Sequence, residues 1–353
     1  MNICILGQNL TSLALAKALL RIGLNVDLVS EGKIENYPKS RTLGISKSNI
    51  EKFNKNICNI NKLSWKITDI KILSDNNLDK ELFSFKDKDY LFSIVRNYEL
   101  QEILRKSLQK EKKFKVVKFL KEKKYNLIIN SDYKNNITKK YFYKKFEKQY
   151  NSYAYTTVLK HKNIKNNQAI QIFTKNGPIA FLPISNSETS IVYSLNNKKK
   201  IDRKGFVKLI KNYNKKLNII RVNEINHFPL KASNLRNYYH KNILAFGDLL
   251  HRIHPLAGQG FNMTIRDIHK LVVLIRNRIN LGLPIDKSIN YEFEKYTKSK
   301  NYLFSNGIDF IYEFFNFERK LNNKFLNQSI SHFVKNKKLN NVFKSFADMG
   351  DLN

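Results

Sequence analysis

The chain has 353 residues and a formal net charge of +35, from 64 Lys and Arg against 29 Asp and Glu. Its 42% hydrophobic and 12% aromatic residues can fill real cores, so the composition excludes wholesale disorder, and the length suggests two domains. Two cysteines, Cys4 and Cys58, exclude a disulfide framework and favour a reducing compartment.

The apolar runs of the sequence indicate whether the chain carries a signal peptide or a transmembrane helix. Residues 1–7 read MNICILG, with no basic leader before the apolar stretch. No run approaches the ~20 apolar residues that span a bilayer. We therefore expect neither secretion nor a transmembrane anchor, and a cytoplasmic location.

The positively charged residues are spread along the whole chain, which is also rich in Asn and Ile. Such a mixture is compatible with a coding bias as well as with a selected surface. A basic surface attracts phosphate backbones and anionic lipid headgroups. No helix-turn-helix, zinc-finger or RNA-binding signature is present, so we expect no specific nucleic-acid partner.

The first elements form a strand-helix-strand unit. Residues 3–6 are a short apolar run typical of a buried parallel strand, and Gly7 ends it. Apolar residues then repeat at helical spacing from Leu10 to Ala18, and Val26 to Val29 predicts a second strand that ends near Glu31. This unit predicts an α/β domain.

The next segments continue the alternation and then change in character. We expect a strand at 91–95, a helix at 99–108, and strands at 115–120 and 127–129. Between residues 152 and 230, short apolar runs separated by polar residues predict an antiparallel sheet, and hence a second domain inserted within the first. From Tyr291 onward, helical spacing of apolar residues predicts amphipathic helices.

The loop after the first strand is compatible with dinucleotide binding. It reads GQNLTS, so only Gly7 of a G-x-G-x-x-G pattern is present, with Asn9 and Ser12 at the other positions. Asn9 tolerates positive φ and Ser12 is small, so both substitutions can be accommodated. Glu31 lies 24 positions after Gly7, near the expected ribose-binding acid. An ordinary strand-helix crossover with a solvated Glu31 explains this loop equally well.

The most informative stretch is residues 242–267, which read NILAFGDLLHRIHPLAGQGFNMTIRD. A predicted strand at 243–246 ends in Gly247 and Asp248, which places a carboxylate at the edge of the sheet where α/β proteins bind ligands. Residues 255–260 then form a tight loop leading into a helix over 261–275. The loop amides and the helix N-terminus favour negative charge.

This stretch resembles the flavoprotein aromatic hydroxylases, specifically the ubiquinone-biosynthesis hydroxylases. Their pattern is G-D-x-x-H, then P, then G-Q-G-x-N, then D. Here it occurs as Gly247, Asp248, His251, Pro255, Gly258, Gln259, Gly260, Asn262 and Asp267. The resemblance extends along nearly the whole chain, through Arg41-Thr42-Leu43, Trp65, Val95, Asn97, Leu100, residues 177–183, residues 228–230 and Met349-Gly350.

The resemblance implies a fold and an activity. The fold is α/β, with a Rossmann-like FAD-binding domain, an inserted antiparallel-sheet substrate domain and C-terminal helices. Its parts are residues 1–70, 91–150 and 231–290 for the FAD-binding domain, 71–90 and 151–230 for the substrate domain, and 291–353 for the helical region. The implied activity is FAD-dependent hydroxylation of a ring carbon of a polyprenylated phenol or quinone precursor, with NAD(P)H and O2.

The resemblance also implies site residues. Pro255, beside the flavin ring, and His251 are the implied catalytic residues. The implied cofactor-binding residues are Gly7, Asn9, Ser12, Glu31, Arg41, Asp132, Gly247, Asp248, Pro255, Gly258, Gln259, Gly260, Phe261 and Asn262. No metal is expected, because His251 and His254 have no cysteine or acidic companions at ligand spacing.

Several residues depart from the family pattern. Tyr133 replaces a glycine after Asp132, and Leu249 and Leu250 replace a small pair. Two explanations follow: an enzyme with adjusted loops, or a degenerate paralogue that serves as a non-catalytic accessory subunit of a quinone-biosynthesis complex. The intact residues 258–262 favour the enzyme. A lipid-borne substrate and a basic surface also predict peripheral contact with an anionic membrane, the inner membrane.

Overall fold

The computed structural model describes residues 2–30, 36–75, 77–196, 201–214, 216–254 and 259–321. Three predicted site residues, Glu31, Pro255 and Gly258, lie outside these ranges, as do Met349 and Gly350. The α/β fold class is confirmed, while the domain boundaries stay a prediction.

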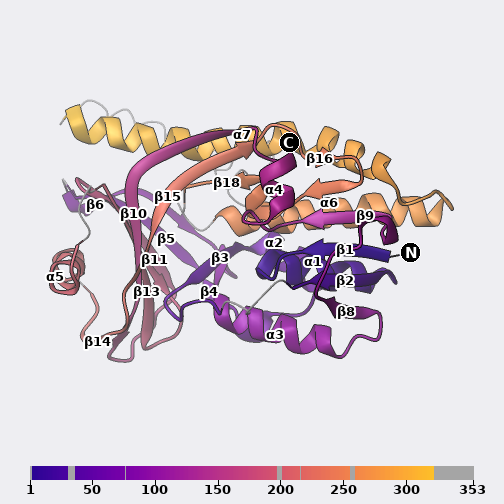
Figure 1. Cartoon of the computed structure of the whole chain (residues 1–353). Coiled ribbons are helices and arrows are strands. Elements are labelled where there is room, and N and C mark those ends of the chain that lie inside the picture. The colour runs from indigo at the N-terminus through magenta and orange to yellow at the C-terminus, as the bar shows by residue number, and fades with distance from the viewer. Residues whose placement is uncertain are drawn as a thin grey trace.

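A six-stranded sheet forms the first layer (Figure 1). Its central strand β1 (Asn2–Leu6) pairs in parallel with β2 (Asn25–Val29) and β9 (Leu127–Asn130), which are flanked by β8 (Phe114–Val117) and β17 (Ile243–Ala245). A short antiparallel strand, β16 (Tyr239–His240), closes one edge. All five parallel strands direct their carboxyl ends to the same edge of the sheet.

The strand predicted at 115–120 is shorter than expected. In the structure β8 ends at Val117, which pairs with Val29, the last residue of β2. Among the described residues, β8 is the edge strand and pairs with β2 alone, and this pairing ends where β2 ends. Phe119 is 75% exposed, so an apolar residue there extends the sequence pattern without extending the sheet.

A larger sheet forms the second part of the molecule. It is antiparallel, as predicted, except that β5 and β11 are parallel. In spatial order its strands are β18 (His251–Arg252), β15 (Asn226–Leu235), β10 (Lys145–His161), β13 (Glu188–Leu195), β12 (Gly177–Pro183), β11 (Gln168–Thr174), β5 (Asp69–Ser74) and β6 (Asn77–Lys86), with β14 (Ile219–Val222) beside β10.

The structure also contains a three-stranded sheet and several short helices. The strands of this small sheet are, in spatial order, β3 (Thr42–Ser46), β7 (Phe92–Arg96) and β4 (Trp65–Ile67). The shorter helices are α1 (Leu10–Arg21), α2 (Lys47–Asn56), α3 (Asn97–Gln109), α4 (Asn136–Tyr141), α5 (Arg203–Tyr213) and the 3-10 turns η1 (Asn61–Leu63), η2 (Glu122–Lys124) and η3 (Gly247–Leu249).

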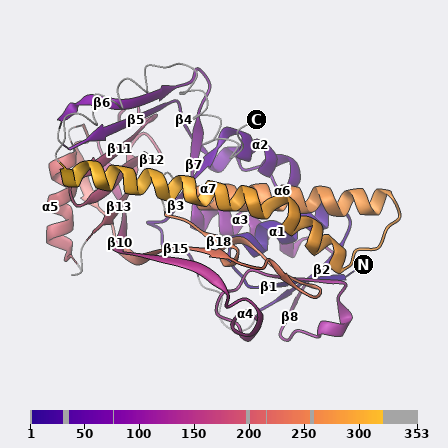
Figure 2. The same ribbon diagram turned by 90° about the horizontal axis from the view of Figure 1, so that it is seen from above.

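Two long helices complete the described chain. Helix α6 (Gln259–Asn280) starts two residues before the predicted position. Amphipathic helices are predicted from Tyr291 onward. Residues 322–353 lie outside the described residues, and the described part of that region is one continuous helix, α7 (Lys287–Leu321). Its sequence contains no proline, and its single glycine, Gly307, is tolerated within the helix. Figures 1 and 2 show α7 lying along the molecule over both large sheets.

The apolar residues gather in two main cores. The larger core surrounds the parallel sheet and takes in α1, α3 and α6. The second lies between the large sheet and α5, where Phe206 packs with its ring centroid 5.2 Å from that of Tyr155 and 6.2 Å from that of Tyr193. The carboxyl edge of the parallel sheet therefore faces the junction between the two parts.

Candidate functional site

The loop between β1 and α1 is closely surrounded by the side chains of Ser12 and Ser131. Gly7 has φ of +111°, and a Cβ at this position would lie 2.9 Å from Ser131 Oγ and 3.1 Å from Ser12 Oγ. Only glycine fits this conformation and this space. Gly7 therefore lets this loop pack closely against Ser12 and Ser131, while its role toward a cofactor stays a prediction.

Asn9 and Ser12, the residues that stand in place of glycines, tie this loop together. Asn9 caps α1: its side-chain oxygen accepts from the Ser12 amide at 3.0 Å, and its Nδ2 donates to the Ser131 carbonyl at 3.0 Å. Ser12 Oγ and Ser131 Oγ share a buried hydrogen bond of 2.6 Å. The sequence did not single out Ser131, since its link to this loop spans more than a hundred residues.

A second glycine brings η3 against the same helix. Gly247 has φ of +62°, and a Cβ there would lie 2.6 Å from Thr11 Cγ2. The backbone that follows β17 thus touches the first turn of α1. The next residue, Asp248, is exposed at this carboxyl edge, where its carboxylate is available to a ligand.

An aromatic and cationic group borders this edge. The Arg41 guanidinium lies 4.8 Å from the Phe228 ring centroid and 5.7 Å from that of Tyr37. The Leu10 amide, in the first turn of α1, donates to the Tyr37 hydroxyl at 3.3 Å. Burial raises the pKa of the Tyr37 hydroxyl, with the Asp248 carboxylate adding to the rise. Tyr37 was not among the predicted site residues.

The bulky residues that depart from the family pattern do not crowd this edge. Leu249 and Leu250 are buried in the larger core. Tyr133 is 56% exposed, with the Lys134 ammonium 5.7 Å from its ring centroid. Asp132 is half-buried, and its Oδ1 accepts from the Lys134 amide at 2.8 Å, so the predicted cofactor carboxylate currently caps a turn.

The start of α6 is fastened to the small sheet. Asn262 is buried: its Nδ2 donates to the Gly44 carbonyl at 2.8 Å and its Oδ1 accepts from the Ser46 amide at 3.1 Å. Phe261 is buried in the core, with its ring centroid 6.4 Å from that of Phe53. The Asn262 side chain therefore binds β3 and the Phe261 side chain packs in the core. Only the backbone groups of these two predicted cofactor-binding residues can contact a ligand.

Gln259 and Gly260 open this helix. Among the described residues, the nearest atom to a Cβ at Gly260 would be Ile253 Cγ1, at 3.9 Å. Gln259 is buried, and among the described residues its Oε1 has no hydrogen-bond partner. A buried acceptor of this kind costs free energy unless a partner is supplied.

His251 belongs to a buried hydrogen-bonded group, and its catalytic role stays a prediction. Its Nε2 donates to Asp267 Oδ2 at 2.6 Å, and Asn301 Nδ2 donates to the two oxygens of the same carboxylate at 3.2 and 3.3 Å. All three residues are buried. The group joins β18, α6 and α7, and it fixes the ring orientation of His251. Asn301 lies outside the family motif, so the sequence did not reveal it.

His254 lies in an apolar setting close to the end of the described segment. Its ring packs edge-on against Tyr150 at 4.9 Å, and Tyr150 donates to Asp309 of α7 at 2.7 Å. Burial lowers the pKa of His254 to about 3. The imidazole is therefore neutral at any ordinary pH, which makes a proton-accepting role for His254 unfavourable.

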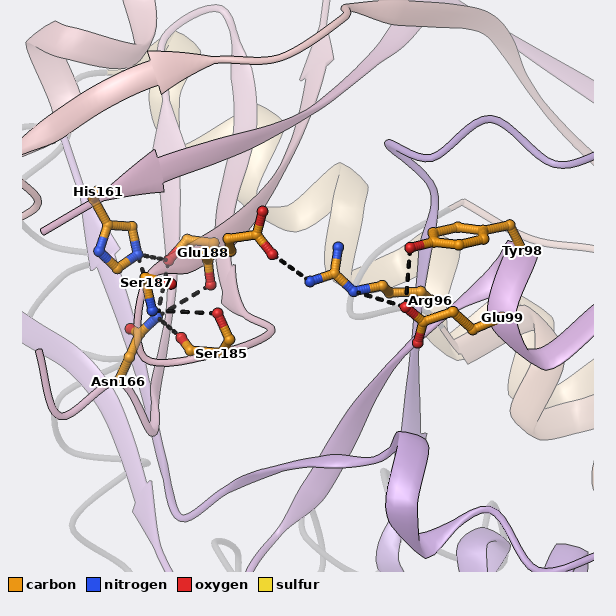
Figure 3. A network of polar contacts seen from close by, with 9 residues as sticks. Arg96, Tyr98, Glu99, His161, Asn166, Ser185, Ser187 and Glu188 are labelled. Atoms are coloured by element: carbon orange, nitrogen blue, oxygen red, sulfur yellow. Dashed lines mark hydrogen bonds and ion pairs between the residues drawn. The ribbon is translucent and has the colours of Figure 1, made fainter. Parts of the chain in front are cut away.

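A polar network braces the small sheet against the large one (Figure 3). Arg96 of β7 donates through Nη2 to Glu188 of β13 at 2.5 Å, and its Nε lies 3.5 Å from Glu99, which accepts from the Tyr98 hydroxyl at 2.9 Å. Asn166 donates to the carbonyl of Glu188 at 3.3 Å. Since β7 also pairs with β3, this network helps to set the position of the strand that holds Asn262.

Metal ligation gains no support from the described parts of the chain. Among these residues no cluster of three or more His, Cys, Asp or Glu side chains could hold a metal ion. That no metal is needed stays a prediction.

Comparison with known proteins gives this edge a chemical meaning. Residues 145–280 match the FAD binding domain family. The chain is 28% identical to 3-demethoxyubiquinol 3-hydroxylase of Escherichia coli (strain K12) over 153 residues, which are 40% of this chain and 38% of that protein. The predicted family resemblance is confirmed.

Further relatives are the mitochondrial ubiquinone biosynthesis monooxygenases COQ6. The human protein is 28% identical over 175 residues, 37% of each chain, and the protein of Saccharomyces cerevisiae (strain ATCC 204508 / S288c) is 40% identical over 65 residues, 18% of this chain and 14% of that one. The aligned segments thus span two-fifths or less of these relatives.

Solved structures share the fold over almost the full chain. Klebsiella pneumoniae HpxO complexed with FAD and uric acid superposes with a TM-score of 0.76 at 11% identity, covering 99% of this chain and 97% of that one. The p-nitrophenol 4-monooxygenase PnpA of Pseudomonas putida DLL-E4 gives 0.75 at 11% identity, with the same coverage. These likenesses show that the chain shares its fold with both proteins.

The described residues fit an FAD molecule at the carboxyl edge. Gly7 and Gly247 let the backbone approach a ligand, the N-terminus of α1 favours a pyrophosphate, and Asp248 is exposed beside them. Gln259 Oε1, which is buried and has no hydrogen-bond partner within the described part of the chain, offers a further acceptor at the start of α6. Among the described helices, none is both long and apolar enough to cross a membrane.

We predict that Asp267→Ala lowers the free energy of unfolding by about 3 kcal/mol, because it leaves His251 and Asn301 with unsatisfied buried groups. Urea denaturation followed by circular dichroism measures this change. Glu102→Ala, which removes an exposed ion pair with Lys106, is the control and should change stability little. A loss as small as that of the control would contradict the structural role of the pair.

We predict that His254 makes the protein less stable as the pH falls. The unfolded chain binds a proton near the ordinary pKa of 6.5, whereas the folded chain does not until about 3, so stability is lost as the pH falls through this window. Between pH 7 and 5 the loss attributable to His254 is about 2 kcal/mol. His254→Leu should remove that part. Parallel pH curves for the two proteins, from urea titrations, would contradict the assignment.

Proposed function

We propose that this chain is an FAD-dependent monooxygenase that hydroxylates a ring carbon of a polyprenylated phenol or quinone precursor in ubiquinone biosynthesis, with NAD(P)H and O2 as co-substrates. The observation that carries the proposal is the carboxyl-edge site, where Gly7, Gly247 and Asp248 meet at the first turn of α1. The family match and the named relatives support the reaction class.

The residues proposed to hold FAD are those that border this edge. They are Gly7, Asn9, Ser12, Arg41, Asp132, Gly247, Asp248, Gln259, Gly260, Phe261 and Asn262, of which Phe261 and Asn262 would contribute backbone groups. Bound FAD would supply the redox chemistry with NAD(P)H and O2. The chain itself binds and orients the reactants and keeps water away.

His251 and the apolar residues near it have positioning roles in this proposal. The bond from His251 to Asp267 fastens β18 to α6. Ile253 and Met263 pack with Phe173 and Phe304. This apolar cluster excludes water beside the proposed reaction site.

The same proposal includes contact with a membrane, because the substrate is lipid-borne. A groove of about 790 Å3 opens between α7 and the neighbouring strands. It presents the exposed rings of Phe146, Tyr291 and Tyr302 next to the cations Arg236 and Lys298. Aromatic rings interleaved with basic side chains suit the headgroup region of an anionic membrane. We accordingly propose a cytoplasmic protein peripheral on the inner membrane, in contact with a quinone-biosynthesis complex.

We predict that the purified protein binds FAD and that Asp248→Ala weakens this binding at least tenfold, since it removes the exposed carboxylate at the site. Titration of FAD fluorescence measures the affinity. Asp286→Ala, an exposed acid of the α6–α7 turn, is the control and should bind as the unaltered protein does. Absence of FAD binding by the unaltered protein would overturn the proposed function.

We predict binding to vesicles of phosphatidylcholine with phosphatidylglycerol at low salt, and weaker binding as salt screens the charge. The double variant Phe146→Ala, Tyr302→Ala should bind at least fivefold less, whereas Ile220→Ala, an exposed apolar residue of β14, should bind normally. Flotation of the protein with the vesicles measures binding. Equal flotation of all three proteins would remove the groove from the proposal.

A further inference from the structure

Tyr37 occupies a position at the FAD site that the family pattern does not assign. Its hydroxyl accepts a hydrogen bond of 3.3 Å from the amide of Leu10, the first residue of α1. The ring is half-buried against the larger core, and the Arg41 guanidinium lies 5.7 Å from its centroid. The hydroxyl thus lies at the helix end that favours negative charge.

The Leu10 amide is one of few donors that this helix end can offer. The Ser12 amide donates to the Asn9 side chain, and the Leu13 amide donates to the Asn9 carbonyl within the helix. The Leu10 and Thr11 amides are the other donors of this first turn, and the Tyr37 hydroxyl accepts from that of Leu10. A pyrophosphate oxygen that accepted from the same N–H would need the place of the Tyr37 oxygen.

We propose that the Tyr37 hydroxyl is an internal competitor for the phosphate position of FAD, which it occupies in the free protein and must leave when the dinucleotide binds. This inference rests on the proposed function. The exchange is favourable, because a charged phosphate oxygen makes a shorter and stronger bond to the amide than a neutral hydroxyl does. The competition lowers the affinity for FAD, and it keeps the end of α1 satisfied when no cofactor is present.

The surroundings of Tyr37 explain why the hydroxyl is held there. Apolar packing fixes the ring at the edge of the core, and Arg41 is sandwiched between the Tyr37 and Phe228 rings. Burial raises the pKa of the hydroxyl, so it is neutral and can accept from the amide. The bond at 3.3 Å is long for an N–H donor, which makes its replacement by a phosphate oxygen inexpensive.

Tyr37→Phe tests the proposal, because it keeps the ring and removes the competing oxygen. We expect it to bind FAD about two- to tenfold more tightly than the unaltered protein, the value of one ordinary hydrogen bond. Riboflavin, which lacks the pyrophosphate, should bind both proteins equally. The FAD-free variant should melt at a slightly lower temperature, since the Leu10 amide loses its partner. Tyr143→Phe, an exposed tyrosine elsewhere, is the matched control and should change none of these values.

The outcomes separate this inference from the proposed function. If the unaltered protein binds FAD and Tyr37→Phe binds it equally or more weakly, the competitor role is wrong; weaker binding would make Tyr37 a ligand of the cofactor. A gain that appears for riboflavin as well would also overturn it, because the effect would then not concern the phosphate. If neither protein binds FAD, the proposed function itself fails, and the inference fails with it.

Discussion

The candidate site depends on backbone contact at two glycines. At Gly7 and Gly247 the chain passes so close to Ser131 and Thr11 that any side chain would collide. These contacts bring the loop after β1, the end of β9 and the turn after β17 to the first turn of α1. We propose that a charged, extended ligand binds at this edge, where the N-terminus of α1 favours negative charge.

Three side-chain groups hold that edge in place from behind. The two hydrogen bonds of Asn262 fasten α6 to β3. The Arg96 and Glu188 pair fastens β7, which pairs with β3, to the large sheet. The hydrogen bond between His251 and Asp267 fastens β18 to α6. Asn262, His251 and Asp267, which belong to the sequence motif, thus also stabilise the packing of α6 against its neighbours. Such rigidity is required to orient a ligand within a fraction of an ångström.

Much of this fold could be predicted from local sequence. Continuous apolar runs identify β1, β9 and β17 as buried parallel strands, and alternation with polar breaks identifies the large sheet. The motif around Gly247 and Asp248 predicts where the site lies. What could not be predicted depends on contacts between distant residues: Ser131 with Ser12, Asn301 with Asp267, and Tyr37 with Leu10. No local pattern encodes which side chain will meet another across more than twenty residues, and the single parallel pair of β5 and β11 was missed for the same reason.

The departures at Asn9 and Ser12 are consistent with a working loop. In a G-x-G-x-x-G loop the second and third glycines remove bulk, but here Asn9 uses its side chain to cap the helix, and Ser12 uses its hydroxyl to bond Ser131. The two side chains occupy space that glycines would leave empty, and their hydrogen bonds fix the conformation of the loop. Gly7 cannot change in this way, because Ser12 and Ser131 already surround it. Gly7 is therefore the position of this loop at which a glycine is required. At positions 9 and 12 a polar side chain is accommodated because it finds a hydrogen-bond partner.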